Sequence, residues 1–171
     1  MKKYSFILSV FIIILLLPVL VSHASSQENP QKVHIGCLNS LTQNRFRDHG
    51  DGTITDHCTN LLWQKGTSNT HPTWAQASAY CSNLTLGGLS GWRVPTIQEL
   101  FSIVNYSHTN GTYAFPLFDF GQSLYPGSLY LWSSTPNVDN SGVAWQIQFT
   151  NGNVSSLQKS SQLEVRCVLS Q

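Results

Sequence analysis

The chain has 171 residues, of which 41% are hydrophobic, 11% aromatic and only 10% charged. Nine Lys and Arg residues against eight Asp and Glu residues give a formal net charge of +1. A balance this close to zero argues against electrostatic capture of nucleic acid or of an anionic membrane, so neither is an expected partner.

The N-terminus has the pattern of a secretory signal peptide. Lys2 and Lys3 precede an apolar stretch over residues 6–21, and Ser22-His23-Ala24 gives a small-x-small cleavage site. An uncleaved anchor is the alternative, but the stretch is slightly short for a spanning helix and contains Pro18. We therefore predict export, with the mature chain at the cell surface, outside the cell or in the periplasm.

Cleavage divides the chain into a signal peptide over residues 1–24, a flexible leader over 25–36 and one domain over 37–171. The two lysines of the signal are lost with it, so seven basic residues face eight acidic ones in the mature chain. No later segment is apolar enough to span a bilayer.

Four cysteines follow the signal, an even number in a chain that we expect in an oxidising compartment. This predicts two disulfides, for which three pairings are open. No CxxC pair occurs, which argues against a zinc site or a thioredoxin-type redox site. The four residues are Cys37, Cys58, Cys81 and Cys167.

The first elements expected after the leader are short strands. A strand begins at Phe46, residues 49–52 (His-Gly-Asp-Gly) make a tight turn, and residues 53–55 form the returning strand. Residues 61–63 (Leu-Leu-Trp) predict a further short strand.

Two helices have clear start signals. Thr73 with Gln76 forms a capping box, after which Trp74, Ala77, Cys81 and Leu84 share one face; Gly87-Gly88 is expected to stop this helix. A second capping box opens the next helix, with an apolar face at the i, i+3, i+4, i+7 spacing. These residues are Thr96 and Glu99 for the box, and Ile97, Leu100, Phe101 and Val104 for the face.

The C-terminal third predicts strands after a long irregular region over residues 105–130. Strands are expected over 130–134 and 143–149, and Asn151-Gly152 is a hairpin turn with Val154 opening the return strand. A last strand over 164–169 places Val165, Cys167 and Leu169 on one face. Helices between terminal strands and a C-terminal sheet indicate an α+β domain.

A series of short motifs runs in a fixed order over residues 44–169. They are Arg45-Phe46-Arg47-Asp48-His49-Gly50-Asp51-Gly52-Thr53-Ile54-Thr55-Asp56, Leu61-Leu62-Trp63-Gln64-Lys65, Trp74-Ala75-Gln76-Ala77, Tyr80-Cys81, Leu84, Trp92-Arg93-Val94-Pro95-Thr96, Glu99-Leu100, Leu131-Trp132-Ser133-Ser134-Thr135, Ala144-Trp145, Phe149, Gly152 and Val165-Arg166-Cys167-Val168. Together they resemble the Lcl C-terminal domain family, the C-terminal domain of Legionella collagen-like adhesins.

The resemblance implies a C-type-lectin-like fold in which two helices pack on small antiparallel sheets beside a long loop region. It also implies that a disulfide ties the first helix to the last strand, here Cys81 to Cys167, with Cys37 and Cys58 as the second pair. The family adhesin binds sulfated polysaccharide. This chain departs from it, because it has no collagen-like stalk and too few cations for an extended basic patch.

Metal binding and catalysis find little support in the sequence. The acidic residues Asp48, Asp51 and Asp56, with His49 and His57, are interpreted as turn chemistry, since their spacing fits no calcium loop. Residues 135–137 (Thr-Pro-Asn) lack the glutamate of calcium-dependent lectins and predict a turn. Because no nucleophile elbow or zinc-protease motif occurs, we predict no metal, no cofactor and no enzyme.

Several large side chains are interpreted as structural. Arg93 is a candidate for a ligand carboxylate or sulfate, but a guanidinium bonded to carbonyls or stacked on an aromatic ring is favoured. The tryptophans Trp63, Trp92, Trp132 and Trp145 are expected in the core.

The region 105–143 contains the candidate ligand-binding residues, because aromatic faces and planar amides suit sugar or protein recognition. An ordered surface loop without a ligand is the alternative. The candidates are Tyr106, His108, Asn110, Tyr113, Tyr125, Asn137, Asp139 and Asn140.

The sequence thus predicts an exported binding module that recognises a polysaccharide or a cell-surface protein. A structural or protein-interaction subunit of an envelope assembly is the alternative, and an enzyme is the least favoured class.

Overall fold

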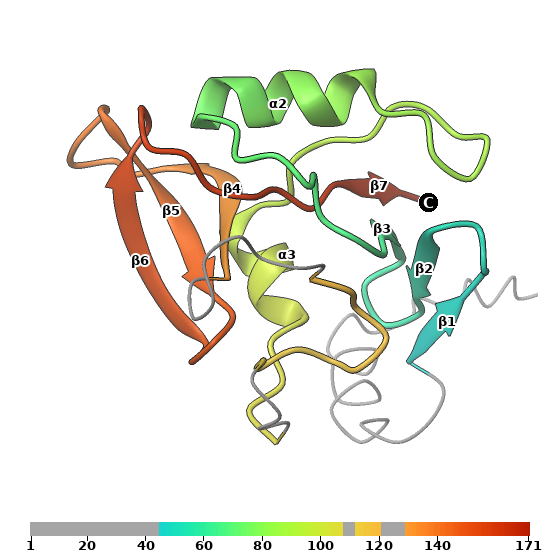
Figure 1. Ribbon diagram of the computed structural model, residues 1–171. Helices are drawn as coiled ribbons and strands as arrows, with labels where there is room; N and C mark the ends of the chain where they lie inside the picture. Colours follow the sequence, from blue (N-terminus) through green and yellow to red (C-terminus); the bar gives the residue numbers. More distant parts are fainter. Residues whose placement is uncertain (1–44, 108–111, 121–128) are drawn as a thin grey trace, which may run out of the picture.

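A computed structural model describes residues 45–107, 112–120 and 129–171. The predicted signal peptide, the leader and Cys37 lie outside the described residues. In the described part the chain forms an α+β fold with two antiparallel sheets and two helices, as the sequence predicts (Figure 1). None of the helices in these ranges is both long and apolar enough to cross a membrane.

The first sheet joins the two ends of the domain. Its strands are β1 (Phe46–Asp48), β2 (Thr53–Asp56), β3 (Leu61–Gln64) and β7 (Val168–Ser170), in the order β1-β2-β3-β7. In the β2–β3 register Ile54 lies opposite Trp63, and β7 places Val168 opposite Trp63 on the other side. The C-terminal strand therefore completes a sheet that the N-terminal strands begin.

The second sheet is a meander of β4 (Tyr130–Pro136), β5 (Val143–Gln148) and β6 (Asn153–Gln158). The Asn151-Gly152 turn lies between β5 and β6 as expected, with Gly152 at φ +72°. All six residues of β6 are exposed, and β6 is one of the two edge strands in this sheet order.

Both helices begin at the predicted capping boxes. The backbone N–H of Thr73 donates to the side chain of Gln76 before α2 (Trp74–Asn83), and that of Thr96 donates to Glu99 before α3 (Ile97–Ser102). The expected stop of α2 at Gly87-Gly88 is wrong. Leu84 already has extended backbone, and the two glycines, both at positive φ, instead form the turn between Leu86 and Leu89.

The core has two clusters on opposite sides of β3. Trp63 and Leu61 face one cluster, where α3 lies between the two sheets, and Leu62 faces the other cluster beneath α2. Trp63, Trp92 and Trp132 are buried as expected, whereas Trp145 is only half-buried. This alternation along β3 places α2 and α3 on different sides of the strand (Figure 1).

The predicted last strand is wrong over residues 164–167. Only Val168–Ser170 pairs as a strand, and Val165, Arg166 and Cys167 are all fully buried, without the expected one-face alternation. Separate residues hold this backbone in place of a neighbouring strand. The Ser68 N–H donates to the Val165 carbonyl, and the Gln64 N–H donates to the Cys167 carbonyl.

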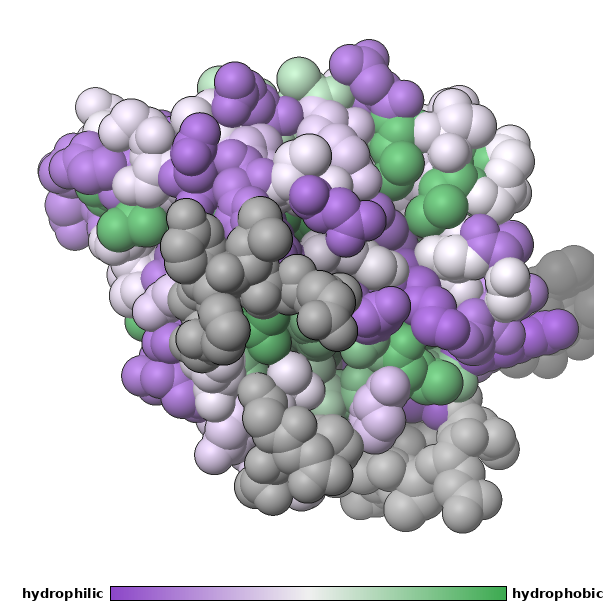
Figure 2. All heavy atoms as spheres, in the orientation of Figure 1, coloured by the Kyte–Doolittle hydropathy of each residue, from purple (hydrophilic) through white to green (hydrophobic). Residues whose placement is uncertain are grey.

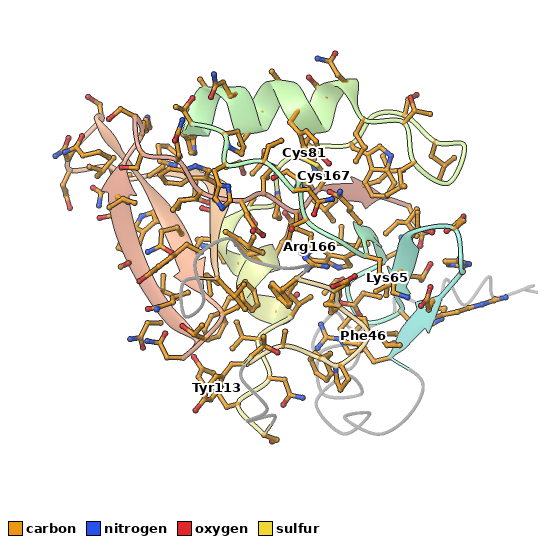
Figure 3. All side chains as sticks on the ribbon, viewed as in Figure 1. Phe46, Lys65, Cys81, Tyr113, Arg166 and Cys167 are labelled. Carbon is orange, nitrogen blue, oxygen red and sulfur yellow. A yellow bond between two sulfur atoms is a disulfide. The ribbon has the colours of Figure 1, made fainter. Side chains whose placement is uncertain are left out.

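The predicted disulfide between Cys81 and Cys167 is confirmed, with Cα atoms 5.5 Å apart. It ties α2 to the residue just before β7 (Figure 3). Cys58 is also disulfide-bonded, but its expected partner Cys37 lies outside the described residues.

Candidate functional site

The segment after α3 holds Tyr106 against the β5–β6 turn. Val104 forms a bridge with Ala114, and the Asn105 N–H donates to the Tyr113 carbonyl at 2.8 Å. Tyr113 in turn donates its N–H to the Phe149 carbonyl at 2.6 Å. The hydroxyl of Tyr106 donates to the carbonyl of Gly152 at 3.0 Å. Tyr106 is thus held by a chain of backbone contacts that ends on the second sheet.

Three aromatic rings meet at this point and are called here the Tyr106 cluster: Phe101, Tyr106 and Tyr113. The ring centroids of Tyr106 lie 6.3 Å from Phe101 and 5.9 Å from Tyr113. Phe101 is 44% exposed and Tyr106 is 56% exposed. The sequence pattern placed Phe101 on the buried face of the second helix, which is wrong, because α3 ends at Ser102 and buries only Leu100 fully.

A groove of about 710 Å³ runs beside this cluster. Its apolar lining comes from α3, the segment before Tyr106, the 112–120 loop and β6, and its polar lining is mostly hydroxyls and amides. In Figure 2 apolar atoms gather around the 112–120 segment. Its lining residues include Gln98, Phe101, Asn105, Tyr106, Phe115 and Val154.

Among the described lining residues, the groove offers a ligand no unpaired charge. Arg45 lines it, but its guanidinium donates to both oxygens of Asp56, at 2.9 and 2.7 Å, and lies over the rings of Phe46 and Phe115. No Asp, Glu or His is found among the described lining residues, so an acid–base pair is missing from that part of the groove.

The other cations are engaged as well. Lys65 pairs with Asp48 at 2.6 Å, a hydrogen bond that lowers the pKa of Asp48 and raises the pKa of Lys65. The ammonium of Lys159 lies 4.4 Å from the ring centre of Trp74. Arg45, Arg93 and Arg166 are likewise engaged by ion pairs or hydrogen bonds. Within the described ranges this leaves Arg47 as the exposed cation without such a contact. A basic patch for a sulfated polymer is therefore not assembled there.

Arg93 is structural, but through an ion pair. Its guanidinium donates to both oxygens of Glu99, at 2.7 and 2.6 Å, which lowers the pKa of the Glu99 carboxyl. The carbonyl-bonded and ring-stacked guanidinium that we expected at Arg93 is found instead at Arg166.

Arg166 is fully buried at the centre of the molecule (Figure 3). It donates to the carbonyls of Gln64, Lys65 and Asp119, and its guanidinium lies against the rings of Phe118 and Phe120. Desolvation lowers its pKa to about 9, so the side chain remains charged at neutral pH.

The acidic residues of the opening hairpin have the expected turn role. Asp48 accepts from the Gly50 N–H, and Asp51 accepts from both the N–H and the hydroxyl of Thr53. Across the described part of the chain no three His, Cys, Asp or Glu side chains are grouped as metal ligands.

The structure separates the predicted ligand-binding residues into two places. Tyr106 and Tyr113 lie at the β5–β6 turn, whereas Asn137, Asp139 and Asn140 lie in the β4–β5 turn at the other end of the same sheet. There Asn137 accepts from the N–H groups of Asp139 and Asn140, so it shapes the turn. The remaining candidates, His108, Asn110 and Tyr125, lie outside the described residues.

A second groove, which sequence reasoning missed, runs along α2 with a volume of about 610 Å³. Gln76, Tyr80 and Asn83 line it from α2, and His71 lines it from the segment before α2. The helical spacing of the three α2 residues was the signal that the sequence offered for this groove. A polar helix face usually contacts only solvent, so the spacing alone did not indicate a groove.

The family model of the Lcl C-terminal domain matches residues 52–169. The chain belongs to the Lcl C-terminal domain family. This is a domain of adhesin-like proteins and not a known catalytic family. No curated protein matches the chain significantly. The match spans β2 to β7 and so includes both helices, the Cys81–Cys167 disulfide and the Tyr106 cluster of this Lcl C-terminal domain.

Proposed function

We propose that this Lcl C-terminal domain is an exported binding module that recognises an uncharged polysaccharide through the groove beside Tyr106. The observation that carries the proposal is a tyrosine residue, 56% exposed yet held by a hydrogen bond from its hydroxyl, on the wall of a groove lined by amides and hydroxyls. Aromatic faces pack on the C–H faces of sugar rings, while amides and hydroxyls exchange hydrogen bonds with sugar hydroxyls.

The engaged cations favour an uncharged ligand. A sulfated chain needs free guanidinium or ammonium groups along its path, and Arg45 at the groove already neutralises Asp56. The proposal therefore keeps the polysaccharide binding that the family resemblance implies but changes the charge of the ligand. Export is supported by the Cys81–Cys167 disulfide, since such bonds persist in oxidising compartments.

The test is binding of the mature chain to a glycan array that carries matched uncharged and sulfated polysaccharides. Retention on uncharged members, lost in Tyr106→Ala, supports the proposal. Retention on sulfated members alone contradicts the proposed ligand class, and binding to none contradicts the polysaccharide function.

A protein partner is the second candidate, and the edge strand β6 favours it. An exposed edge strand can add a strand from another chain, and Val154 and Leu157 are 41% and 37% exposed along it. Recovery of one stable envelope protein with the wild-type chain, without any glycan binding, would select this function.

A further inference from the structure

The glycine of the β5–β6 turn meets two separate demands. Its φ of +72° is a conformation that Gly adopts freely and that Asn also tolerates. The turn conformation alone therefore does not require a residue without a side chain at position 152.

The second demand comes from Tyr106. A Cβ atom on Gly152 would lie 2.6 Å from Cε1, 2.9 Å from Cζ and 3.0 Å from the hydroxyl oxygen of Tyr106. All three atoms belong to the ring and hydroxyl of Tyr106, so a side chain at position 152 requires the ring to move. Gly152 is buried even though its neighbours Asn151 and Asn153 are exposed.

Tyr106 is held from several sides and is still 56% exposed as a residue. Its hydroxyl donates to the carbonyl of Gly152, and Tyr113 and Phe101 lie beside it. A side chain that is fixed before binding loses little rotamer freedom when a ligand arrives, which favours affinity.

We infer that Gly152 is a positioning residue that acts on ligand binding through Tyr106. Because Gly152 has no side chain, the Tyr106 ring can lie on the β5–β6 turn in the orientation that lines the groove. This inference rests on the proposed function. Any side chain at position 152 displaces the ring, breaks its hydrogen bond to the turn and weakens binding without touching the ligand itself.

Gly50 provides a matched control. It has φ +75° in the β1–β2 turn, and a Cβ atom there would meet nothing within 4 Å. Gly152→Asn and Gly50→Asn therefore both place an Asn at positive φ, and only Gly152→Asn adds a contact with Tyr106. Asn is preferred to Ala because it tolerates positive φ and keeps both variants folded.

The experiment measures each variant in two ways, with and without Tyr106→Ala. Urea unfolding midpoints give a double-mutant cycle between positions 152 and 106. Affinity for a panel of dextran, mannan, galactan and cello-oligosaccharides gives the binding effect. We expect Gly152→Asn to weaken binding about tenfold in the wild-type background and to have no added effect beside Tyr106→Ala, as expected for a hot-spot aromatic. Gly50→Asn should leave affinity within about twofold.

Additive unfolding midpoints would overturn the contact between the two residues. Coupled midpoints with unchanged affinity in Gly152→Asn would overturn the positioning role and leave the proposed function intact. If the wild-type chain itself retains no member of the panel, the proposed function fails and the positioning role fails with it, while the unfolding cycle still reports the contact.

Discussion

Arg166 Nη2 donates to the backbone carbonyl of Asp119 at 2.7 Å, which joins the segment before β7 to the loop that supplies Phe118 and Phe120. The same guanidinium donates to the carbonyls of Gln64 and Lys65 at the end of β3. One fully buried side chain thus links three segments that are distant in sequence.

Arg166→Lys should destabilise the domain, because an ammonium cannot reach all three carbonyls or cover both rings. The carbonyls left without donors would cost about 2–4 kcal/mol in the free energy of unfolding. Urea denaturation of the purified variant measures this. Arg47→Lys, on an exposed residue, is the control, and an equal midpoint for both variants would contradict the structural role of Arg166.

The double variant Cys81→Ala, Cys167→Ala should lose stability through the unfolded state. The bond closes a loop with a sequence separation of 86 residues, for which chain entropy gives about 4–5 kcal/mol as an upper figure. Denaturation with and without reductant checks this. Reduction should lower the midpoint of the wild-type chain by much more than it lowers the midpoint of the variant. Equal losses in both would contradict the contribution of this bond.

Glu99→Gln should cost about 1 kcal/mol at neutral pH, because the amide still caps α3 but no longer pairs with Arg93. The pKa of Glu99 is lowered in the folded state, so its contribution is present above the ordinary value of 4.5 and is lost as the pH falls through the lowered pKa. Unfolding measured from pH 7 to pH 2 should therefore show the difference between wild type and variant shrinking in acid. A difference that stays constant or grows in acid would oppose this account.

Binding should depend little on ionic strength. Arg45, the cation among the described lining residues of the groove, is already paired with Asp56, so binding should release few counterions. Affinity for the retained polysaccharide, compared between about 50 mM and 500 mM NaCl, should change by less than about threefold. A loss of tenfold or more would indicate a basic site and a charged ligand.

The sequence predicts those parts of the fold that local hydrogen bonds determine. Both helix starts and the Asn151-Gly152 turn were predicted correctly, because a capping box or a turn glycine at positive φ involves only near neighbours. The end of α2 was not, since Leu84 leaves the helix to pack partly against the cluster beneath α2. The burial of Arg166 was not predicted either, because its three acceptors lie 47, 101 and 102 residues away.

The candidate site was predicted in part for the same reason. Tyr106 and Tyr113 were named from their aromatic character, but nothing local places Tyr106 on a turn 46 residues further along the chain. Asn137, Asp139 and Asn140 were grouped with them because they share a polar region, yet the sheet separates the two turns by the length of β5. Phe101 and Val154 join the groove only through tertiary packing.

The affinities of wild type, Tyr106→Ala and Asp139→Ala for the same uncharged polysaccharide test the central claim most directly. Tyr106→Ala removes the exposed ring at the groove, whereas Asp139→Ala removes an exposed residue at the opposite end of the sheet. The expected result is a loss of about tenfold or more for Tyr106→Ala and a change within about twofold for Asp139→Ala. Unchanged affinity in Tyr106→Ala, or an equal loss in Asp139→Ala, would contradict the groove beside Tyr106 as the binding site.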